Sequence, residues 1–218
     1  MRESPLNAPF QPVDAQPAKL NRRQAAKLRT RQKVLEAARG LFAERGYDPA
    51  TIRDIARAAG MSTGAVFANF QDKAELFETV LLEEMEAAAE VLRDAAQTDG
   101  AVDQRLIAAL TAGYARNLNQ LPLVQAFVAR SWFQPVASEL RGRAAVKGLL
   151  VTIGDVLRDG VRKGELSDKA DIRLLSEMIW DAYLSNYRRA AYDGWSADTL
   201  AARIGEQLTI LLASARAR

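Results

Sequence analysis

The chain has 218 residues, of which 49% are hydrophobic and 26% charged, a balance typical of soluble globular proteins. It contains neither cysteine nor histidine, which excludes disulfides, thiol nucleophiles, cysteine-ligated zinc and catalytic arrangements that need an imidazole. The net charge of +3 is unevenly divided, because residues 1–73 carry 13 Lys and Arg against 7 Asp and Glu (+6) and residues 74–218 carry 17 against 20 (−3). This asymmetry indicates a polyanion-binding module attached to a larger, mildly acidic part.

Neither the termini nor the interior carry a membrane signal. No run of about 18 apolar residues occurs, so we expect no membrane-spanning helix. Residues 1–27 contain four of the seven prolines and lack the apolar core of a secretory signal. We therefore expect a cytoplasmic protein, with no enzyme activity, metal site or cofactor.

Residues 1–27 are expected to form a flexible, basic N-terminal arm. A basic cluster begins inside the arm and continues into the first predicted helix: Arg22, Arg23, Lys27, Arg29, Arg31 and Lys33. One interpretation is a solvated tail. The other is an arm that lies along the DNA backbone or in the minor groove, as homeodomain arms do.

The apolar spacing after the arm predicts a helix at about residues 30–45, ending at Gly46. Two short helices follow, the first capped by Thr51 and ended by Gly60, the second capped by Ser62 and reaching about Phe70. A long helix capped by Asp72 comes next. Because this helix joins residues 28–73 to the rest of the chain, we expect it to transmit conformational changes between the two parts.

The remainder, residues 74–218, is predicted to be helical throughout. Prolines at 122 and 135 separate helices, and a long helix spans about 138–163. The last two helices cover about 171–192, starting at Asp168 or Asp171, and 196–216, capped by Ser196. The fold class expected is therefore all-α. A three-helix helix-turn-helix domain over residues 28–73 precedes a larger helical domain over residues 74–218.

The two short helices meet the physical needs of a DNA-reading unit. The second must enter the major groove, so its outer face needs small or polar side chains and its inner face apolar ones. Val66 and Phe70 are four residues apart and can face inward, which leaves Thr63, Gly64, Ala65 and Asn69 free to face outward. A helix-turn-helix used only for protein contacts is the alternative, and the local charge of +6 argues against it.

Residues 51–73, TIRDIARAAGMSTGAVFANFQDK, resemble the DNA-binding signature of TetR-type (TetR/AcrR) transcriptional regulators. The specific resemblance extends over about residues 30–82, and beyond it only the helical architecture is similar. It implies a homodimeric, ligand-responsive regulator, most often a repressor, that binds a pseudo-palindromic double-stranded operator. The implied DNA-binding residues are Thr51, Ser62, Thr63, Gly64, Ala65, Phe67, Asn69 and Lys73.

The resemblance also assigns roles. Thr51 and Lys73 match phosphate-contacting positions, and Thr63 to Ala65 would lie nearest the bases. Phe67 and Asn69 depart from the Tyr and His that often fill these positions and touch the DNA backbone: Phe67 lacks a hydroxyl to donate to a phosphate, and Asn69 keeps hydrogen-bonding groups without a titratable ring. Other interpretations stay open: Thr51 and Ser62 are helix caps in any case, Lys73 could be merely solvated, and Phe67 could simply pack.

Aromatic residues on the predicted C-terminal helices are candidates for an effector pocket, because such pockets are mostly apolar with a few polar groups. The candidates are Tyr114, Trp132, Phe133, Trp180, Tyr183 and Tyr187, with Asn117, Arg130 and Asn186 as possible polar partners. Core packing explains any single one equally well. The alternative function is therefore a DNA-binding protein whose C-terminal domain only dimerises, through its last two helices, or binds a protein, without a small-molecule effector.

Overall fold

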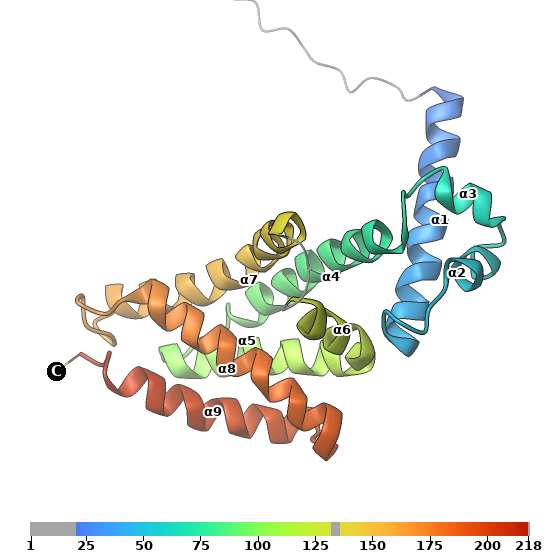
Figure 1. Ribbon diagram of the computed structural model, residues 1–218. Coiled ribbons are helices and arrows are strands. Elements are labelled where there is room, and N and C mark those ends of the chain that lie inside the picture. Colours follow the sequence, from blue (N-terminus) through green and yellow to red (C-terminus); the bar gives the residue numbers. More distant parts are fainter. Residues whose placement is uncertain (1–20, 132–135, 218) are drawn as a thin grey trace, which may run out of the picture.

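The structure is a computed structural model that describes residues 21–131 and 136–217, and these form an all-α protein, as predicted (Figure 1). The helices are α1 (Arg22–Arg45), α2 (Ile52–Ala58), α3 (Thr63–Phe67), α4 (Lys73–Ala95), α5 (Val102–Asn117), the 3-10 turn η1 (Leu118–Gln120), α6 (Leu121–Ser131), α7 (Val136–Arg162), α8 (Ile172–Asp193) and α9 (Ala197–Ala213). Trp132 and Phe133 lie outside the described residues.

Two apolar cores organise the chain. The N-terminal core joins α1, α2 and α3 to the start of α4, with residues such as Phe42, Ile55 and Phe77 almost fully buried. The C-terminal core lies among the second half of α4 and helices α5 to α9. Because α4 contributes to both cores, it is the continuous element that joins the N-terminal helices to the larger domain (Figure 1).

Helix α1 begins eight residues before its predicted start at Thr30, so residues 22–27 of the expected arm are helical. A capping box explains the early start: Asn21 Oδ1 accepts from the Gln24 amide at 2.9 Å, and the Asn21 amide donates to Gln24 Oε1 at 3.0 Å. These residues carry no apolar periodicity, which is why the hydrophobic pattern did not reveal them.

Helix α6 is the second link between the domains. Its Leu123 is buried in the N-terminal core, although the chain around it belongs to the C-terminal part, while Val124 is buried in the C-terminal core. Pro122 lies in the first turn of α6, where a missing amide hydrogen costs little. The division at residue 73 therefore does not separate two independent cores.

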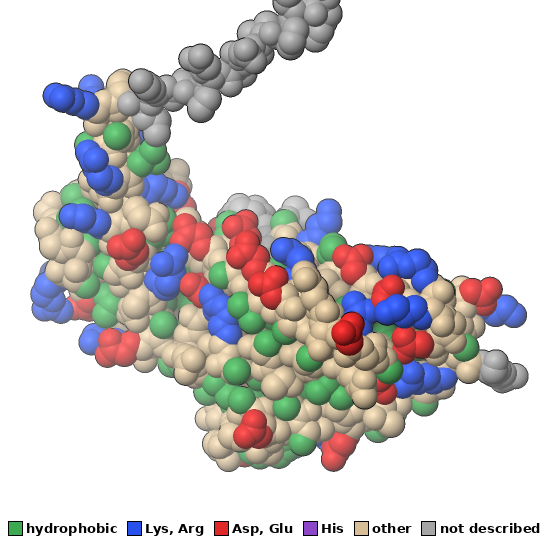
Figure 2. All heavy atoms as spheres, turned by 180° about the vertical axis from the view of Figure 1, so that it is seen from behind, with side chains coloured by type: hydrophobic (Ala, Val, Ile, Leu, Met, Phe, Trp, Pro, Cys, Tyr) green, Lys and Arg blue, Asp and Glu red, His purple; other side chains and the backbone are tan. Residues whose placement is uncertain are grey.

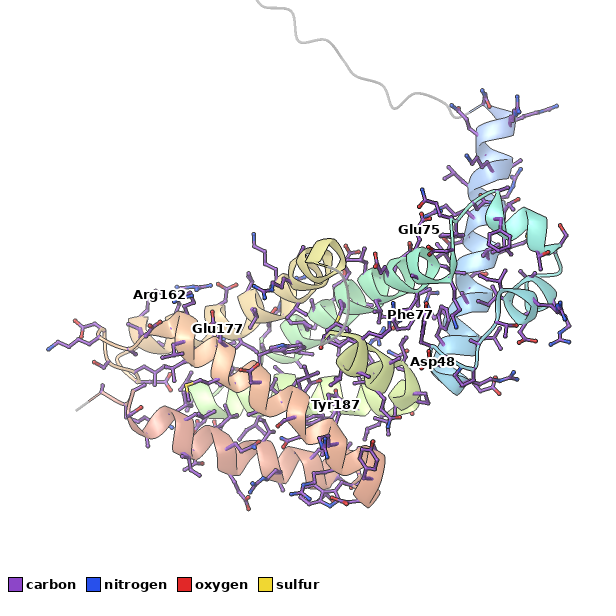
Figure 3. All side chains as sticks on the ribbon, in the orientation of Figure 1. Asp48, Glu75, Phe77, Arg162, Glu177 and Tyr187 are labelled. Carbon is purple, nitrogen blue, oxygen red and sulfur yellow. The ribbon has the colours of Figure 1, made fainter. Side chains whose placement is uncertain are left out.

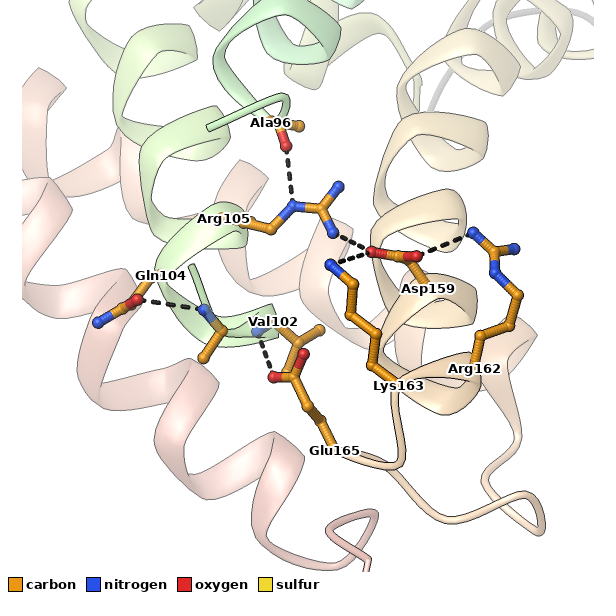
Figure 4. A network of polar contacts seen from close by, with 9 residues as sticks. Ala96, Val102, Gln104, Arg105, Asp159, Arg162, Lys163 and Glu165 are labelled. Atoms are coloured by element: carbon orange, nitrogen blue, oxygen red, sulfur yellow. Dashed lines mark hydrogen bonds and ion pairs between the residues drawn. The ribbon is translucent and has the colours of Figure 1, made fainter. Parts of the chain in front are cut away.

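A polar network closes the far end of the larger domain (Figure 4). The Asp159 carboxylate on α7 accepts from Arg105 on α5, from Arg162 at 2.9 Å and from Lys163 at 2.9 Å. Glu165 Oε2 accepts from the backbone amide of Val102 at 2.7 Å and so caps α5. Together these contacts fix the end of α7 to the start of α5.

Candidate nucleic-acid interface

Helices α2 and α3 each begin at the N-cap that the sequence predicts. Thr51 Oγ1 accepts from the Asp54 amide at 3.1 Å, and Ser62 Oγ accepts from the Ala65 amide at 3.2 Å. Between the helices Gly60 has a φ of +67°, a left-handed conformation that glycine adopts without strain. The result is the tight turn that sets α3 against α2.

Helix α3 buries one face and exposes the other. Val66 is fully buried and Phe70, just beyond α3, is 2% exposed. On the outer side Ser62, Thr63 and Gly64 are exposed, Ala65 is partly exposed, and the Phe67 ring is 54% exposed. Phe67 therefore does not pack in the core, and this face presents small and polar groups beside one free aromatic ring.

Asn69 is less available than its neighbours. Its side-chain Nδ2 donates to the backbone carbonyl of Ala65 at 2.9 Å, and the backbone carbonyl of Asn69 accepts from the Arg31 guanidinium at 2.6 Å. The same guanidinium lies 4.0 Å from the centroid of the Phe70 ring. Arg31 thus fixes α1 to the end of α3, a role that the sequence analysis did not assign to it.

Lys73 is held within the protein. Its Nζ donates to the carbonyls of Tyr47 (2.9 Å), Asp48 (3.3 Å) and Ala50 (3.1 Å), and it lies 4.1 Å from the Tyr47 ring centroid. Burial lowers the pKa of Lys73, and the nearby Asp48 carboxylate opposes this shift. All three ammonium protons are thus used to hold the turn before α2, so Lys73 is not simply solvated.

The Tyr47 ring links this turn to α6. The Arg130 guanidinium lies 3.9 Å from the ring centroid and 5.7 Å from that of Phe77, whose place at the junction of α4 and α1 is seen in Figure 3. Tyr47 therefore contacts two cations, Lys73 and Arg130. Arg130 serves here at the domain junction and not among the residues that line the aromatic cavity.

A buried carboxylate forms a second contact between the domains. Glu84 on α4 is 7% exposed, and its oxygens lie 2.9 Å from Arg39 Nε on α1 and 2.7 Å from Arg116 on α5. Gln120 also donates to it at 2.9 Å. Burial acts to raise the pKa of Glu84, but the hydrogen bonds from Gln120 and Arg116 and the charges of Arg116 and Arg39 outweigh it and lower the pKa.

Four of the predicted pocket aromatics do come together in the larger domain. Tyr114 and Tyr183 stack with centroids 4.5 Å apart, Tyr187 lies edge-on to both, and Trp180 is 5.7 Å from Tyr183. Figure 3 shows Tyr187 pointing into the helical body. The set is a contiguous aromatic cluster.

Hydrogen bonds tie the phenols of this cluster together. The Tyr183 and Tyr187 hydroxyls are 2.7 Å apart, Asn117 donates to Tyr187 at 3.0 Å, and Asn186 donates to Tyr114 at 3.0 Å. Burial raises the pKa of all three tyrosines, that of Tyr187 to about 12, so all three stay neutral at physiological pH. The predicted polar partners Asn117 and Asn186 are therefore in place.

The cavity beside the cluster is small. It measures about 20 Å³ and is lined by Asn117, Trp180, Tyr183 and Tyr187 together with Val124 and Phe127 of α6. That volume holds about one water molecule. In this conformation the cluster packs as a core, and a ligand larger than water would have to displace some of the helices that line the cavity, α6 among them.

Comparison with known proteins identifies the N-terminal domain. The family described as "Bacterial regulatory proteins, tetR family" matches residues 34–80, the segment that contains α2 and α3. These residues therefore carry the N-terminal domain of the tetR family. The HTH-type transcriptional repressor AcnR of Corynebacterium glutamicum is 45% identical over 65 residues, which are 30% of this chain and 35% of that protein.

Beyond the N-terminal domain the similarity is lower. The chain spans only about a third of the length of AcnR. The regulator UidR of Escherichia coli is 26% identical over 155 residues, covering 70% of this chain and 76% of that one. The crystal structure of FadR from Bacillus subtilis in complex with stearoyl-CoA matches 81% of this chain and 96% of its own, with a TM-score of 0.71 and 18% identity. At that identity the likeness concerns the fold alone.

Proposed function

We propose that this protein is a TetR-family transcriptional repressor that binds a pseudo-palindromic DNA operator as a homodimer and is released from it by a small-molecule effector. The observation that carries the proposal is α3, whose inner face is clamped by Val66 while its outer face presents Ser62, Thr63 and Gly64. An exposed, small-residue helix of this kind fits the major groove. Such a protein acts in the cytoplasm, by binding and not by catalysis.

The proposed DNA contacts follow the exposure of the side chains. Ser62, Thr63, Gly64 and Ala65 approach base edges and backbone, and the Phe67 ring contacts sugars or a thymine methyl group. Thr51, exposed at the start of α2, contacts phosphate. Asn69 and Lys73 contribute mainly indirectly, because their polar groups hold the reading unit together.

Dimerisation is proposed through α8 and α9. Both carry large apolar side chains that a monomer leaves in water: Leu174 is 49%, Met178 42% and Ile210 75% exposed. Covering such a surface favours association. A two-fold dimer also places two copies of α3 in successive major grooves, about 34–36 Å apart.

The aromatic cluster is the proposed effector site. The FadR structure contains stearoyl-CoA, and we propose that an effector enters this chain at the cavity beside Tyr183 and Tyr187. Since Val124 and Phe127 line it, an effector larger than water would push α6 and with it Leu123 in the N-terminal core. If the operator binds the undisplaced state better, a ligand that prefers the displaced state weakens operator binding by the same factor by which the operator weakens ligand binding.

The small cavity also favours a second candidate, in which the larger domain only dimerises or binds a protein. A ligand pocket usually measures about 300–1,000 Å³, against the 20 Å³ found here. A thermal-shift screen of small molecules, followed by operator release, distinguishes the two. The effector proposal predicts a compound that both raises the melting temperature and releases DNA, and the second candidate predicts none.

Selection from a random duplex pool tests the central proposal. We expect enrichment of a pseudo-palindromic site, which the protein should bind more tightly than random duplex DNA when heparin is present as a competitor. The affinity for this site should fall steeply as the salt concentration rises. Equal binding to every duplex, or none, would refute the proposal.

A further inference from the structure

Helix α1 extends well beyond the core that supports it. Its capping box starts the helix at Arg22, but the first buried side chain is Val34, twelve residues later. Figure 1 shows this end of α1 projecting past α3. Residues 22–33 therefore form a helical rod that extends beyond the apolar core and is held to the end of α3 by Arg31.

The projecting segment is strongly basic. It contains no Asp or Glu, and its six cations are Arg22, Arg23, Lys27, Arg29, Arg31 and Lys33. Figure 2 shows Lys and Arg side chains gathered on it. Its first turn has no acidic residue, although the helix dipole favours acids there and disfavours cations. An anionic partner would remove this electrostatic cost.

Two of these cations lie beside the end of α3. Arg23 and Lys27, four residues apart, line a groove of about 450 Å³ together with Gln24, Thr30, Ala68 and Asn69. No acidic residue lines it. Arg31 fixes the orientation of the groove through its bond to the Asn69 carbonyl. Arg29 and Lys33 are also one turn apart and exposed, but neither lines this groove.

We propose that Arg23 and Lys27 bind the phosphate backbone of the duplex whose major groove α3 enters, which makes the start of α1 a second DNA-binding element. The inference rests on the proposed function. The backbone that flanks the major groove is the polyanion nearest to Ala68 and Asn69 at the end of α3, and phosphate contacts from Lys and Arg fix register without reading sequence. The rod thus adds affinity and orientation, not base preference.

The test compares two double variants of the full chain that remove equal charge from the same helix, R23A/K27A and R29A/K33A. We expect R23A/K27A to bind every duplex more weakly and to make the slope of log affinity against log salt shallower by about 0.9 for each lost contact in each protomer. R29A/K33A should keep nearly the wild-type slope. Equal slopes for the two variants would overturn the inference.

A charge reversal separates binding from folding. R23E places an acid in the first turn of α1, so it should raise the helix content or melting temperature while it lowers DNA affinity further than R23A does. A fall in stability alongside the affinity would overturn the interpretation as a phosphate contact. Failure of the proposed function is distinct, since the wild-type protein itself would then prefer no duplex over heparin.

Discussion

Lys73 shows how one side chain can fix the position of α3 through contacts within the protein. Its ammonium group donates to three carbonyls in the turn between α1 and α2 and lies against the Tyr47 ring. The turn fixes where α2 begins, and α2 supports α3. The orientation of the outer face of α3 therefore depends on Lys73.

Replacing Lys73 by methionine should destabilise the N-terminal domain. The apolar stem is kept, but three carbonyls lose a charged donor, a change that costs about 2–3 kcal/mol. Denaturant unfolding measures the loss, and duplex titration should show weaker binding to all sequences. A variant that binds DNA less well with unchanged stability would instead assign Lys73 to direct phosphate contact. K33M, on the exposed side of α1, is the control.

The helix caps of α2 and α3 were predicted from neighbouring residues in the sequence, whereas contacts between residues far apart in the sequence were not. Thr51 and Ser62 lie within four residues of the amides they cap, so their roles can be read from adjacent letters. The partner of Tyr47 on α6, Arg130, is 83 positions away. Such a pairing depends on how the helices pack, and no periodicity in the sequence encodes it.

At the scale of elements, α4 and α6 both join the two cores. Glu84 on α4 forms ion pairs with Arg39 of α1 and Arg116 of α5. Asn117, which follows Arg116 in the chain, donates a hydrogen bond to the Tyr187 hydroxyl. A continuous set of contacts therefore leads from the aromatic cluster to α1. Any change in the packing of α5 bears directly on the N-terminal helices.

E84Q should weaken this junction strongly. Neutralising this buried carboxylate leaves Arg116 without its described counter-charge and leaves Arg39 with Glu83 alone, at a cost of about 3 kcal/mol. E83Q is the control, since Glu83 pairs with Arg39 but is 36% exposed and should contribute less than about 1 kcal/mol. Thermal or denaturant unfolding of both variants measures the difference. Similar losses would show that Glu84 has no special role.

The ion pairs of Asp159, which join α7 to α5, predict that the stability of the folded protein depends on pH. The hydrogen bond from Lys163, with those from Arg105 and Arg162, lowers the pKa of Asp159 to about 2 from an ordinary 3.8, while burial opposes the shift. Because the folded pKa lies below the unfolded one, the stabilisation is fully present above about pH 4 and is lost as the pH falls toward 2.

D159N should therefore be less stable than the wild type at neutral pH, and the gap should close between about pH 4 and pH 2. Melting temperatures measured across this range test it. D155N removes a carboxylate from the same helix, one whose only described partner is the exposed Arg158, and should leave the profile unchanged. A gap that persists at pH 2 would point to a packing defect and not to the charge of Asp159.

Helix existence followed from the sequence more reliably than helix boundaries did. Asp72 and Ser196 begin α4 and α9 as predicted, and of the two starts left open for α8 the structure has Asp171, because each of these side chains accepts from an amide three residues on. The start of α1 was missed, since Asn21 and Gln24 form a cap without an apolar stripe behind them. That Leu123 of α6 is buried in the N-terminal core depends on tertiary packing alone.

At the scale of the whole molecule, the exposed apolar residues of α8 and α9 bear on assembly. Within the described part of the chain seven large hydrophobic side chains are exposed, and four of them are Leu174, Met178, Tyr192 and Ile210. The others are scattered singly over α1, α3 and α7. A concentration of this kind on the last two helices is what a subunit interface requires.

The double variant M178E/I210E should shift the protein from dimer to monomer, because burying two carboxylates in an apolar interface costs several kcal/mol. Sedimentation measures the mass. Operator affinity should fall steeply with it, since each copy of α3 would then bind half a site without the effective concentration that linkage provides. L28E makes the same change at a 51% exposed residue of α1 and should stay dimeric. If M178E/I210E also stays dimeric, the subunits meet through another surface, and the spacing of the two reading helices must be set there.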